Sequence, residues 1–401
     1  MRILFLSTWF PYPPDNGSKL RVYHLLRGLS QAHEVCLASF AFNPVLADAP
    51  AELRQICQEI VIVPINPYKV NQVSTLARFL ARRPVVIRPV PAMSEAVEKL
   101  LHQYSFDVVI ASTEVMAVYA LSAPSATVKI LEEHNSLTRW LREHHCAQRS
   151  PVAKLRAWAS WQKARYYEGA TFAKFDLVTM VSEMDREVSE TALPGFRGRV
   201  EVVPNGTDCR HNQPGLAKAR PGALVYNGAL TYGANYDAMR YFLNQIYPVV
   251  RRSISSVSLT ITGSTEGVDR SGLRLDDSVH LAGYVEDVRL PVAEASVCVV
   301  PIRQGGGTRL KILESMALGT PVVATSKGAE GLAVVNGQHL VIADSADDFA
   351  HAVVRLLNNE GERQQLAAHA RQLVEQRYDW QAISSQFTSL LEERALERKN
   401  P

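Results

Sequence analysis

Short runs rich in valine and isoleucine recur along the whole chain, and helix-length amphipathic stretches separate them. This alternation is typical of parallel sheets that helices cover on both faces. Seven runs lie in the first half: 1–8, 33–40, 59–65, 106–112, 127–134, 175–182 and 200–206. Six lie in the second half: 223–230, 256–264, 278–285, 295–302, 320–326 and 338–344. The pattern predicts an α/β protein with two Rossmann-like, doubly wound sheets that bind ligands at the carboxyl ends of their strands.

The length of the chain also favours two domains. One hydrophobic core rarely organises more than about 300 residues, and this chain has 401. The segment 204–222, PNGTDCRHNQPGLAKARPG, is dense in proline, glycine and polar residues and shows no periodicity. We therefore expect a first domain over 1–203 and a second over 204–378.

The composition excludes several classes of protein. Hydrophobic residues at 47% and charged residues at 21% are ordinary for a soluble globular chain. No apolar run approaches the roughly 18 residues that a membrane span needs, and the first run is too short for a signal peptide. The five cysteines are scattered, which argues against a disulfide framework and against a zinc site. We expect a cytoplasmic protein in a reducing compartment.

A glycine-rich turn stands between a predicted strand that ends at Pro301 and a predicted helix that ends before Gly319. The stretch from 301 to 325 reads PIRQGGGTRLKILESMALGTPVVAT. Backbone N–H groups of Gly305–Gly307, together with the positive end of the helix dipole, suit a phosphate. The positive charges of Arg309 and Lys311 would strengthen the binding of that phosphate. Glu314 can accept both hydroxyls of a ribose. The alternative is a tight turn in which the carboxylate caps the helix and the cations face solvent.

Several motifs follow one another in a specific order. They are PPDNGSKLR (13–21), EEHNS (132–136), VSEMD (181–185), VVPNGTD (202–208), YNGAL (226–230), GYVEDVR (283–289), GGGTRLKILESMALGTPVV (305–323) and YDW (378–380). With them the chain resembles the retaining nucleotide-sugar glycosyltransferases of family 4, which have the GT-B architecture of two Rossmann-like domains facing across a cleft. The first motif is most similar to bacterial exopolysaccharide-associated sugar transferases. The resemblance implies sugar transfer from a nucleoside diphosphate sugar with retention of configuration, with no cofactor and no required metal.

The resemblance also implies a donor site in the second domain. Glu314 matches the second glutamate of the family's paired-glutamate motif, which contacts the donor ribose, and the first glutamate would lie at Gly306. The cations that many relatives place after the first strand of this domain are missing from NGALTYGANYDA (227–238). We therefore interpret Arg309 and Lys311 as compensating charge for the diphosphate. The implied donor-binding residues are Gly17, Ser18, Gly228, Gly305, Gly306, Gly307, Thr308, Leu310 and Glu314.

On the acceptor side, His134 matches the family's active-site histidine. We expect it to contact the sugar or the acceptor and, with Arg309 and Lys311, to form the catalytic set. Acceptor-side residues would be Asn135, Lys19 and Arg21. A simple proline-rich turn with a helix cap is the alternative for 13–21. A new amphipathic segment begins at Asp379, and relatives use such a helix as a brace, so we expect 379–401 to cross back onto the first domain.

Two basic, aromatic-bearing segments lie in the first half, Arg139–Lys174 and 69–88. They are either solvated helix faces or attachment points for anionic lipid. If they attach to lipid, we expect a docking face that consists of Arg78, Arg82, Arg83, Lys154, Arg156 and Trp158. The acceptor would be a glycan, a lipid-linked sugar or a small molecule. The net charge of +3 is too small to imply nucleic acid. Alternative functions are a nucleotide-sugar epimerase or phosphorylase, or a non-catalytic protein that binds nucleotide sugar or RNA.

Overall fold

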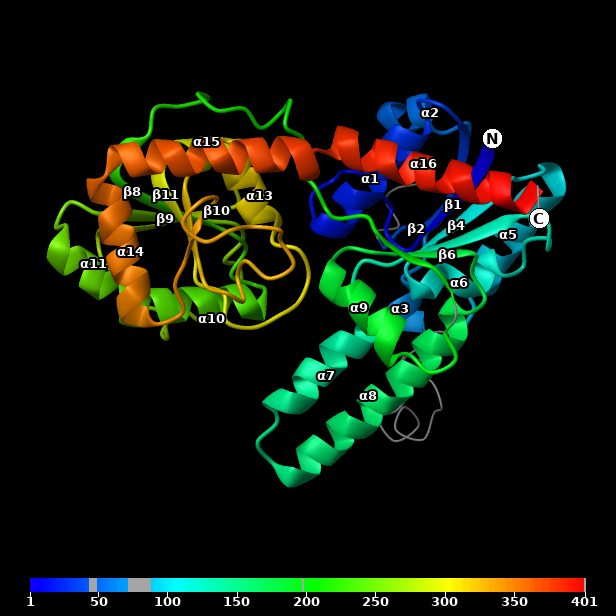
Figure 1. Ribbon diagram of the computed structural model, residues 1–401, viewed down its shortest axis with the longest axis horizontal. Helices are drawn as coiled ribbons and strands as arrows, with labels where there is room; N and C mark the ends of the chain where they lie inside the picture. Colours follow the sequence, from blue (N-terminus) through cyan, green and yellow to red (C-terminus); the bar gives the residue numbers. More distant parts are fainter. Residues whose placement is uncertain (43–48, 71–87, 197, 400–401) are drawn as a thin grey trace. The chain divides into compact units, whose positions relative to one another are not determined.

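The computed structural model describes residues 1–42, 49–70, 88–196 and 198–399 (Figure 1). The chain divides into two compact units. Unit 1 comprises Met1–Pro204 and Ile383–Pro401, and unit 2 comprises Asn205–Ala382. The expected divisions fall after residues 203 and 378. Most of the basic segment 69–88, including Arg78, Arg82 and Arg83, lies outside the described residues.

Unit 1 contains a seven-stranded parallel sheet with the order β3-β2-β1-β4-β5-β6-β7 (Figure 1). The strands are β1 (Arg2–Ser7), β2 (Glu34–Phe40), β3 (Glu59–Val63), β4 (Val108–Ser112), β5 (Val128–Glu132), β6 (Leu177–Met180) and β7 (Val200–Val202). Its helices are α1 (Gly17–Leu29), α2 (Ala51–Ile56), α3 (Pro67–Val70), α5 (Pro91–Gln103), α6 (Glu114–Ala120), α7 (Leu137–Ala147), α8 (Pro151–Phe172), α9 (Glu183–Ala192) and, from Ile383 onward, α16 (Trp380–Lys399). The central strands are almost wholly buried, because helices cover both faces.

Unit 2 contains a six-stranded parallel sheet with the order β10-β9-β8-β11-β12-β13. The strands are β8 (Arg220–Asn227), β9 (Ser258–Thr262), β10 (Val279–Gly283), β11 (Ala295–Val300), β12 (Val322–Ala324) and β13 (Val341–Ile342). The helices are α10 (Gly233–Tyr241), a π-helical turn η1 (Phe242–Ile246), α11 (Tyr247–Ser253), α12 (Arg289–Ala293), α13 (Leu310–Ala317), α14 (Ala346–Asn358) and α15 (Glu360–Arg377). Figure 1 shows α10 and α11 on one side of the sheet and α13 and α15 on the other.

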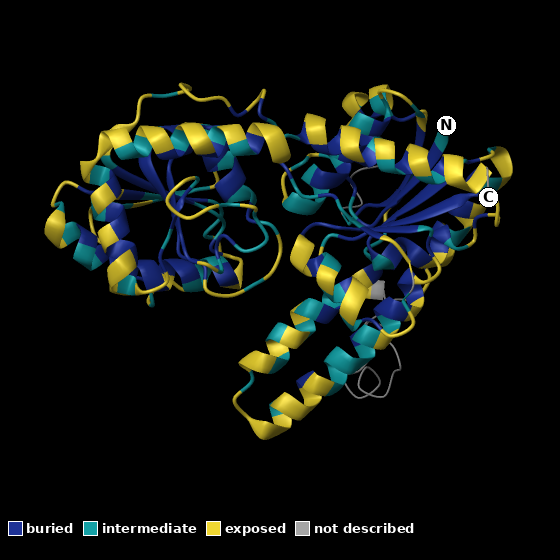
Figure 2. Cartoon of the chain, viewed as in Figure 1, coloured by how far each residue is buried: buried dark blue, intermediate teal, exposed yellow. Residues whose placement is uncertain are grey.

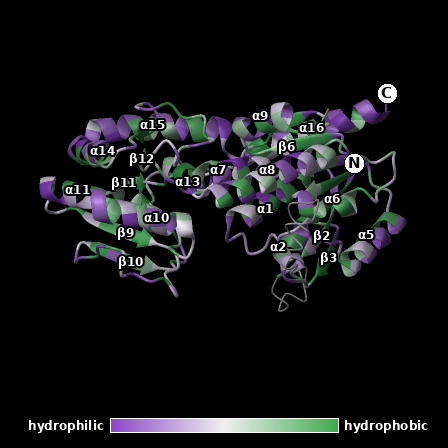
Figure 3. Ribbon diagram, turned by 90° about the horizontal axis from the view of Figure 1, so that it is seen from below, coloured by the Kyte–Doolittle hydropathy of each residue, from purple (hydrophilic) through white to green (hydrophobic). Residues whose placement is uncertain are grey.

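Both sheets are doubly wound, as the sequence predicted, and each of the thirteen apolar runs contains one strand. The strands are predominantly hydrophobic along their length (Figure 3). The strand order reverses between β1 and β4 in unit 1, and between β8 and β11 in unit 2. Ligands of doubly wound sheets bind at the carboxyl ends of the strands beside such a reversal. The topology therefore selects the loops that follow these four strands.

Helix α1 begins at Gly17, within the motif at 13–21. The side chain of Asn16 accepts a hydrogen bond from the Lys19 backbone N–H, so Asn16 is the N-cap and the helix includes Gly17 and Ser18. This places two of the predicted donor-binding residues in the first turn of α1. That turn follows the loop after β1.

The last helix contacts several elements of unit 1. Glu393 forms an ion pair with Arg199, and Lys399 forms one with Asp107, just before β4. The side chain of Gln386 donates to the Val202 carbonyl in β7. Helix α1 approaches α16 most closely at Gly28, where an added Cβ atom would lie 2.2 Å from the Cβ of Ser384. Only glycine fits this helix–helix contact without movement.

Gly28→Ala is expected to destabilise unit 1 by about 1–3 kcal/mol, because the new methyl group overlaps Ser384. Without the overlap, alanine inside a helix would add up to about 1 kcal/mol of stability. Hydrogen exchange of the unit 1 strands measures the effect without assuming that the whole chain unfolds in one step. Adding Ser384→Gly should restore much of the protection, whereas equal losses in the single and double variants would contradict the overlap.

Candidate functional site

The glycine-rich loop of unit 2 follows β11, and Gly228 follows β8, so both lie where the strand order reverses. Gly305 and Gly307 have positive φ angles of 93° and 84°, which favour glycine. The φ angle of Gly306 does not lie in this positive range, and a Cβ atom added to Gly306 would meet no atom within 4 Å. The backbone thus requires the first and third glycines but not the middle one.

Arg309 holds the loop in this conformation. Its guanidinium donates to the carbonyls of Gly306 and Gly305 at 2.8 and 2.6 Å, and the residue is 7% exposed. The expectation that Arg309 contacts the diphosphate directly is therefore revised. The buried guanidinium fixes two carbonyls of the loop and acts on a ligand through the shape of that loop.

Lys311 extends from the first turn of α13 to the carboxyl end of β8. Its Nζ lies 3.0 Å from the hydroxyl of Tyr226, 3.1 Å from Oδ1 of Asn235 and 4.1 Å from the centroid of the Tyr226 ring. A Cβ on Gly228 would come within 2.5 Å of this Nζ. Desolvation, helped by the charge of Arg309, lowers the pKa of Lys311 to about 7. The ammonium therefore titrates near neutral pH.

Glu314 lies one turn further along α13 and also faces the end of β8. Its carboxylate accepts a hydrogen bond of 2.9 Å from the side chain of Asn227, the last residue of β8. The hydroxyl of Thr262, at the end of β9, donates a hydrogen bond of 3.3 Å to the amide oxygen of Asn227. Burial raises the pKa of Glu314, while Lys311 and Asn227 lower it. The ends of β8, β9 and β11 and the start of α13 thus bring Glu314, Lys311 and the Gly305–Gly307 loop together.

In unit 1, a buried ion pair joins α1 to the end of β5. The guanidinium Nε of Arg21 donates to Oε1 of Glu132 at 2.5 Å, and Nη1 donates to the Pro204 carbonyl at 2.9 Å. Both side chains are at most 1% exposed. Burial alone would raise the pKa of Glu132, but the charges of Arg21 and His134 hold it well below its usual range. The enclosed Arg21 side chain does not reach outward, so its assignment to the acceptor side is revised to a positioning role.

The same carboxylate orients His134. Its second oxygen accepts a hydrogen bond from Ser112, and Nε2 of His134 lies 3.2 Å from that oxygen and 3.0 Å from the serine hydroxyl. Nδ1 lies 3.2 Å from the hydroxyl of Ser18. The structure thus brings together three predicted residues, His134, Ser18 and Arg21, through Glu132, which the sequence reasoning missed.

The remaining predicted residues of unit 1 lie in the same region but outside this network. Gly17 is the first residue of α1. Lys19 forms an ion pair with Asp15 at 2.9 Å. Asn135 is exposed and follows the histidine directly. These three residues border the carboxyl edge of the sheet at β1 and β5.

Sequence models of two known families together match most of the chain. The model described as "Glycosyltransferase Family 4" matches residues 16–211, and the model described as "Glycosyl transferases group 1" matches residues 221–359. The chain belongs to the family 4 glycosyltransferases. The sequence-based recognition of the family is confirmed.

Curated relatives of this glycosyltransferase agree with that membership. An uncharacterized 44.6 kDa protein in the cps region of Klebsiella pneumoniae is 22% identical over 403 residues, which is 98% of this chain and 99% of that protein. Glycogen synthase of Mycobacterium tuberculosis is 29% identical over 225 residues, 52% of each chain. The chain therefore spans about half the length of the latter relative and the whole of the former.

Solved structures show that the fold is GT-B. Sucrose-phosphate synthase from Thermosynechococcus elongatus matches with a TM-score of 0.71 and 16% identity over 98% of this chain and 99% of that one. Anabaena HepE, solved in complex with UDP, matches with a TM-score of 0.68 and 16% identity over 98% and 100%. At 16% identity, these matches show that this chain has the same fold as the two proteins and show nothing about its substrates.

Unit 1 of the glycosyltransferase holds further buried carboxyl groups near His134. Glu133 is 2% exposed and shares a hydrogen bond with Glu114 at the start of α6. Burial raises the pKa of Glu133 well above its usual value, and the charges of Glu114 and Glu168 raise it further. The fold thus shifts the pKa values of the adjacent glutamates 132 and 133 in opposite directions.

Three aromatic side chains lie near the carboxyl groups of Glu114 and Glu133. The ring centroids of Trp9 and Phe42 are 4.7 Å apart, and the Tyr68 ring lies 6.3 and 6.0 Å from them. Burial and the charges of Glu114 and Glu133 raise the pKa of Tyr68. These residues follow β1, β2, β3, β4 and β5, so they share the carboxyl edge of the sheet. Aromatic faces and carboxyl groups are suited to a sugar, which has apolar faces and a rim of hydroxyls.

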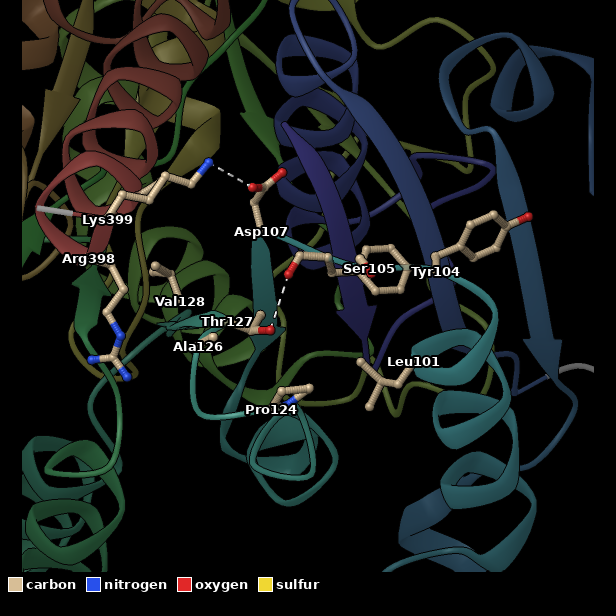
Figure 4. Close-up of a pocket in the computed structure, with 12 residues that line it drawn as sticks. Leu101, Tyr104, Ser105, Asp107, Pro124, Ala126, Thr127, Val128, Arg398 and Lys399 are labelled. Carbon is tan, nitrogen blue, oxygen red and sulfur yellow. Dashed lines mark hydrogen bonds and ion pairs between the residues drawn. The ribbon is translucent and has the colours of Figure 1, made fainter.

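A hollow of about 460 Å³ lies at the opposite edge of the same sheet (Figure 4). Asp107 and Thr127, which line it, directly precede β4 and β5, and Arg398 and Lys399 of α16 line its other side. Lys399 pairs with Asp107, while Arg398 pairs with Asp176 and donates to the Ser125 carbonyl. This hollow is a packing feature beneath the last helix and lies away from the candidate site.

Within the described part of the chain, no three His, Cys, Asp or Glu side chains are grouped to hold a metal ion.

Glu132→Gln and Glu133→Gln form a matched pair with opposite expected effects. The first leaves the buried Arg21 charge unpaired and should cost unit 1 about 3–5 kcal/mol at pH 7. The second removes a carboxyl group whose charged form burial disfavours, and an amide of the same shape should cost little. Hydrogen exchange of β5 amides measures both. Because the pKa of Glu132 is lowered in the fold, its contribution is complete above its unfolded pKa of about 4.3 and is lost at lower pH. Equal effects of the two variants at pH 7 would contradict the opposite pKa shifts of the two glutamates.

Proposed function

We propose that this glycosyltransferase moves a sugar from a nucleoside diphosphate sugar to an acceptor hydroxyl with retention of configuration, in the synthesis of a bacterial cell-surface or exopolysaccharide glycan. The observation that carries the proposal is the gathering of Glu314, Lys311 and the Gly305–Gly307 loop where the strand order of unit 2 reverses. The relative in a Klebsiella cps region and the HepE complexes with UDP and UDP-glucose support the substrate class.

In the proposed donor complex, Glu314 accepts hydrogen bonds from both ribose hydroxyls. The N–H groups of the glycine loop and the start of α13 bind the diphosphate, and Lys311 supplies the charge. Asn227 fixes the carboxylate, since its amide already donates to it. Gly306, which stands where the family's first glutamate would lie, contributes backbone to the donor sugar and no side chain. No metal and no cofactor take part in this proposal.

The proposed reaction is a front-face substitution. The bond between the anomeric carbon and the diphosphate oxygen breaks while the acceptor oxygen bonds to the same face of that carbon. The acceptor proton passes to the departing diphosphate oxygen. Lys311 and the fixed N–H dipoles stabilise the charge that develops there, and in a partly desolvated site such dipoles act strongly. His134, held by Glu132 and Ser18, contacts the sugar or the acceptor as a hydrogen-bonding group and not as a nucleophile.

Unit 1 would bind the acceptor at its own carboxyl edge, where Asn135, Lys19 and the aromatic rings lie. We propose a lipid-linked sugar or growing glycan at the cytoplasmic face of a membrane, with peripheral contact between unit 1 and anionic lipid. No helix within the described residues combines the length and the apolar character that a membrane crossing requires. A soluble acceptor would need no such contact.

Binding and product analysis test this function together. Glu314→Ala should weaken the binding of the matching nucleoside diphosphate about 100-fold by calorimetry, because two charge-assisted hydrogen bonds are lost. Binding of the 2′,3′-dideoxy nucleotide should not change, which controls for misfolding. NMR of the product should show the anomeric configuration of the donor. Undiminished ribonucleotide binding, conversion of the donor without an acceptor, or dependence on phosphate would contradict the assignment and indicate another reaction.

Lys311 predicts a pH dependence of donor binding. Its pKa is lowered to about 7 in the free protein, and a bound diphosphate would raise it. Above pH 7, binding must therefore take up a proton, and affinity should fall by up to about tenfold per pH unit. Lys311→Arg should remove this dependence, because arginine stays charged. The matching nucleoside, which has no phosphate, should bind with no dependence on pH. A flat profile for the unchanged protein would exclude Lys311 from the diphosphate site.

A further inference from the structure

Helices α7 and α8 form an antiparallel hairpin that extends away from the sheet of unit 1 (Figure 1). The buried carboxylate of Glu168 in α8 accepts the backbone N–H groups of Leu137 and Thr138 and so holds the start of α7. The buried residues of α8 are Ala157, Ala164, Glu168, Gly169, Thr171 and Phe172. Before Glu168 only Ala157 and Ala164 are buried, and at 100° per residue they lie within about 20° of each other, so the described residues bury only a narrow strip of this part of the helix.

Large hydrophobic residues occupy the face of α8 opposite this strip. Val152, Leu155, Trp158 and Tyr166 are 68%, 65%, 47% and 70% exposed. At 100° per residue they lie within about 120° of arc, which makes an apolar stripe that the polar Gln162 interrupts between Trp158 and Tyr166. Exposed residues cover most of the hairpin beyond its base (Figure 2). A solvated surface helix would carry polar residues here, so the stripe indicates an apolar partner.

Cations border the stripe on both sides. Lys154 lies on one edge, and Arg156 and Lys163 lie on the other, by the same angular arithmetic. Arg142 and Arg149 add charge on α7 and at the tip of the hairpin, and Trp140 on α7 is 47% exposed. Arg142, Arg149, Lys154 and Arg156 form no ion pair within the part of the chain that the structure describes. Lys154 and Arg156 thus flank the apolar stripe with positive charge that no ion pair among the described residues compensates.

We propose that this face of α8, defined by Val152, Leu155, Trp158 and Tyr166 with Lys154 and Arg156, docks on the surface of an anionic lipid membrane. A helix with an apolar face between flanking cations lies in the plane of such an interface, where the apolar side chains enter the acyl boundary and the cations contact lipid phosphates. The stripe distinguishes this partner from nucleic acid, which would need the cations alone. From Val152 to Tyr166 the helix extends about 21 Å, enough for several lipid headgroups.

The inference rests on the proposed membrane contact of the enzyme but not on its chemistry, because no residue of the stripe belongs to the donor or acceptor site. Membrane binding and sugar transfer can therefore fail separately. The face also differs from the one that the sequence suggested. It needs none of Arg78, Arg82 and Arg83, and it adds three exposed hydrophobic residues that share the side of α8 occupied by Trp158.

Co-sedimentation with vesicles tests the proposal. The full chain should bind vesicles of phosphatidylcholine with 30% phosphatidylglycerol at low salt, bind pure phosphatidylcholine weakly, and be released by 0.5 M salt. Lys154→Glu with Arg156→Glu should lower the binding constant at least tenfold. Lys218→Glu with Arg252→Glu makes the same change of net charge at exposed sites of unit 2 and should leave binding unchanged. Equal losses in the two charge-reversed proteins would overturn the assignment of the surface.

Apolar substitutions separate lipid from other polyanions. Leu155→Ser with Trp158→Ser keeps every charge and should still lower vesicle binding several-fold. Brominated lipid should quench tryptophan emission, and Trp158→Phe should lose most of this quenching. Nucleoside diphosphate binding should be unchanged in all these variants, which shows that they fold. The proposal is overturned if the unchanged protein stays in the supernatant at low salt, or if the serine variant binds vesicles and a homopolymeric RNA as well as the unchanged protein does.

Discussion

The buried ion pair between Arg21 and Glu132 is the interaction on which unit 1 depends. Removing two charges from water is costly, and their attraction compensates only when every remaining hydrogen-bonding atom also finds a partner. Hydrogen bonds to the Pro204 carbonyl, Ser112 and His134 supply such partners for Nη1 of Arg21 and for the second oxygen of Glu132. One interaction thereby connects α1, β4, β5 and Pro204, where the chain first leaves unit 1. The histidine of the candidate site is held by the same carboxylate that stabilises the fold.

In unit 2 the proposed compensation for a missing charge depends on where the side chain of Lys311 lies. The loop after β8 lacks the cations that many relatives have there. Lys311 reaches the same strand end from α13, and a glycine at 228 leaves room for its ammonium. The site thus contains one cation, Lys311, whose pKa is lowered to about 7, and a second cation, Arg309, whose guanidinium binds the loop carbonyls. The two neighbouring cations differ in their contacts, since Lys311 reaches the end of β8 and Arg309 holds the loop.

Most of the fold could be predicted from the sequence, because buried parallel strands leave apolar runs that no other arrangement explains. The glycine loop, Glu314 and His134 were also accessible, since each follows a predicted strand. Glu132 was not, because it is separated from Arg21 by 111 positions and only packing brings the two together. Nor could the sequence show that Arg309 is buried while Lys311 reaches the strand end, since both lie at the start of one helix. Asn227 gave a signal that was overlooked, a polar residue at the end of a buried strand.

The middle position of the three glycines has a consequence for how such enzymes diversify. Gly305 and Gly307 are fixed by their backbone angles, whereas the space around Gly306 is open. A single codon change there can introduce an acid, an amide or a hydroxyl next to the proposed sugar pocket without altering the loop around it. Selection for a different glycan can therefore act on one residue while the rest of the nucleotide site is inherited intact.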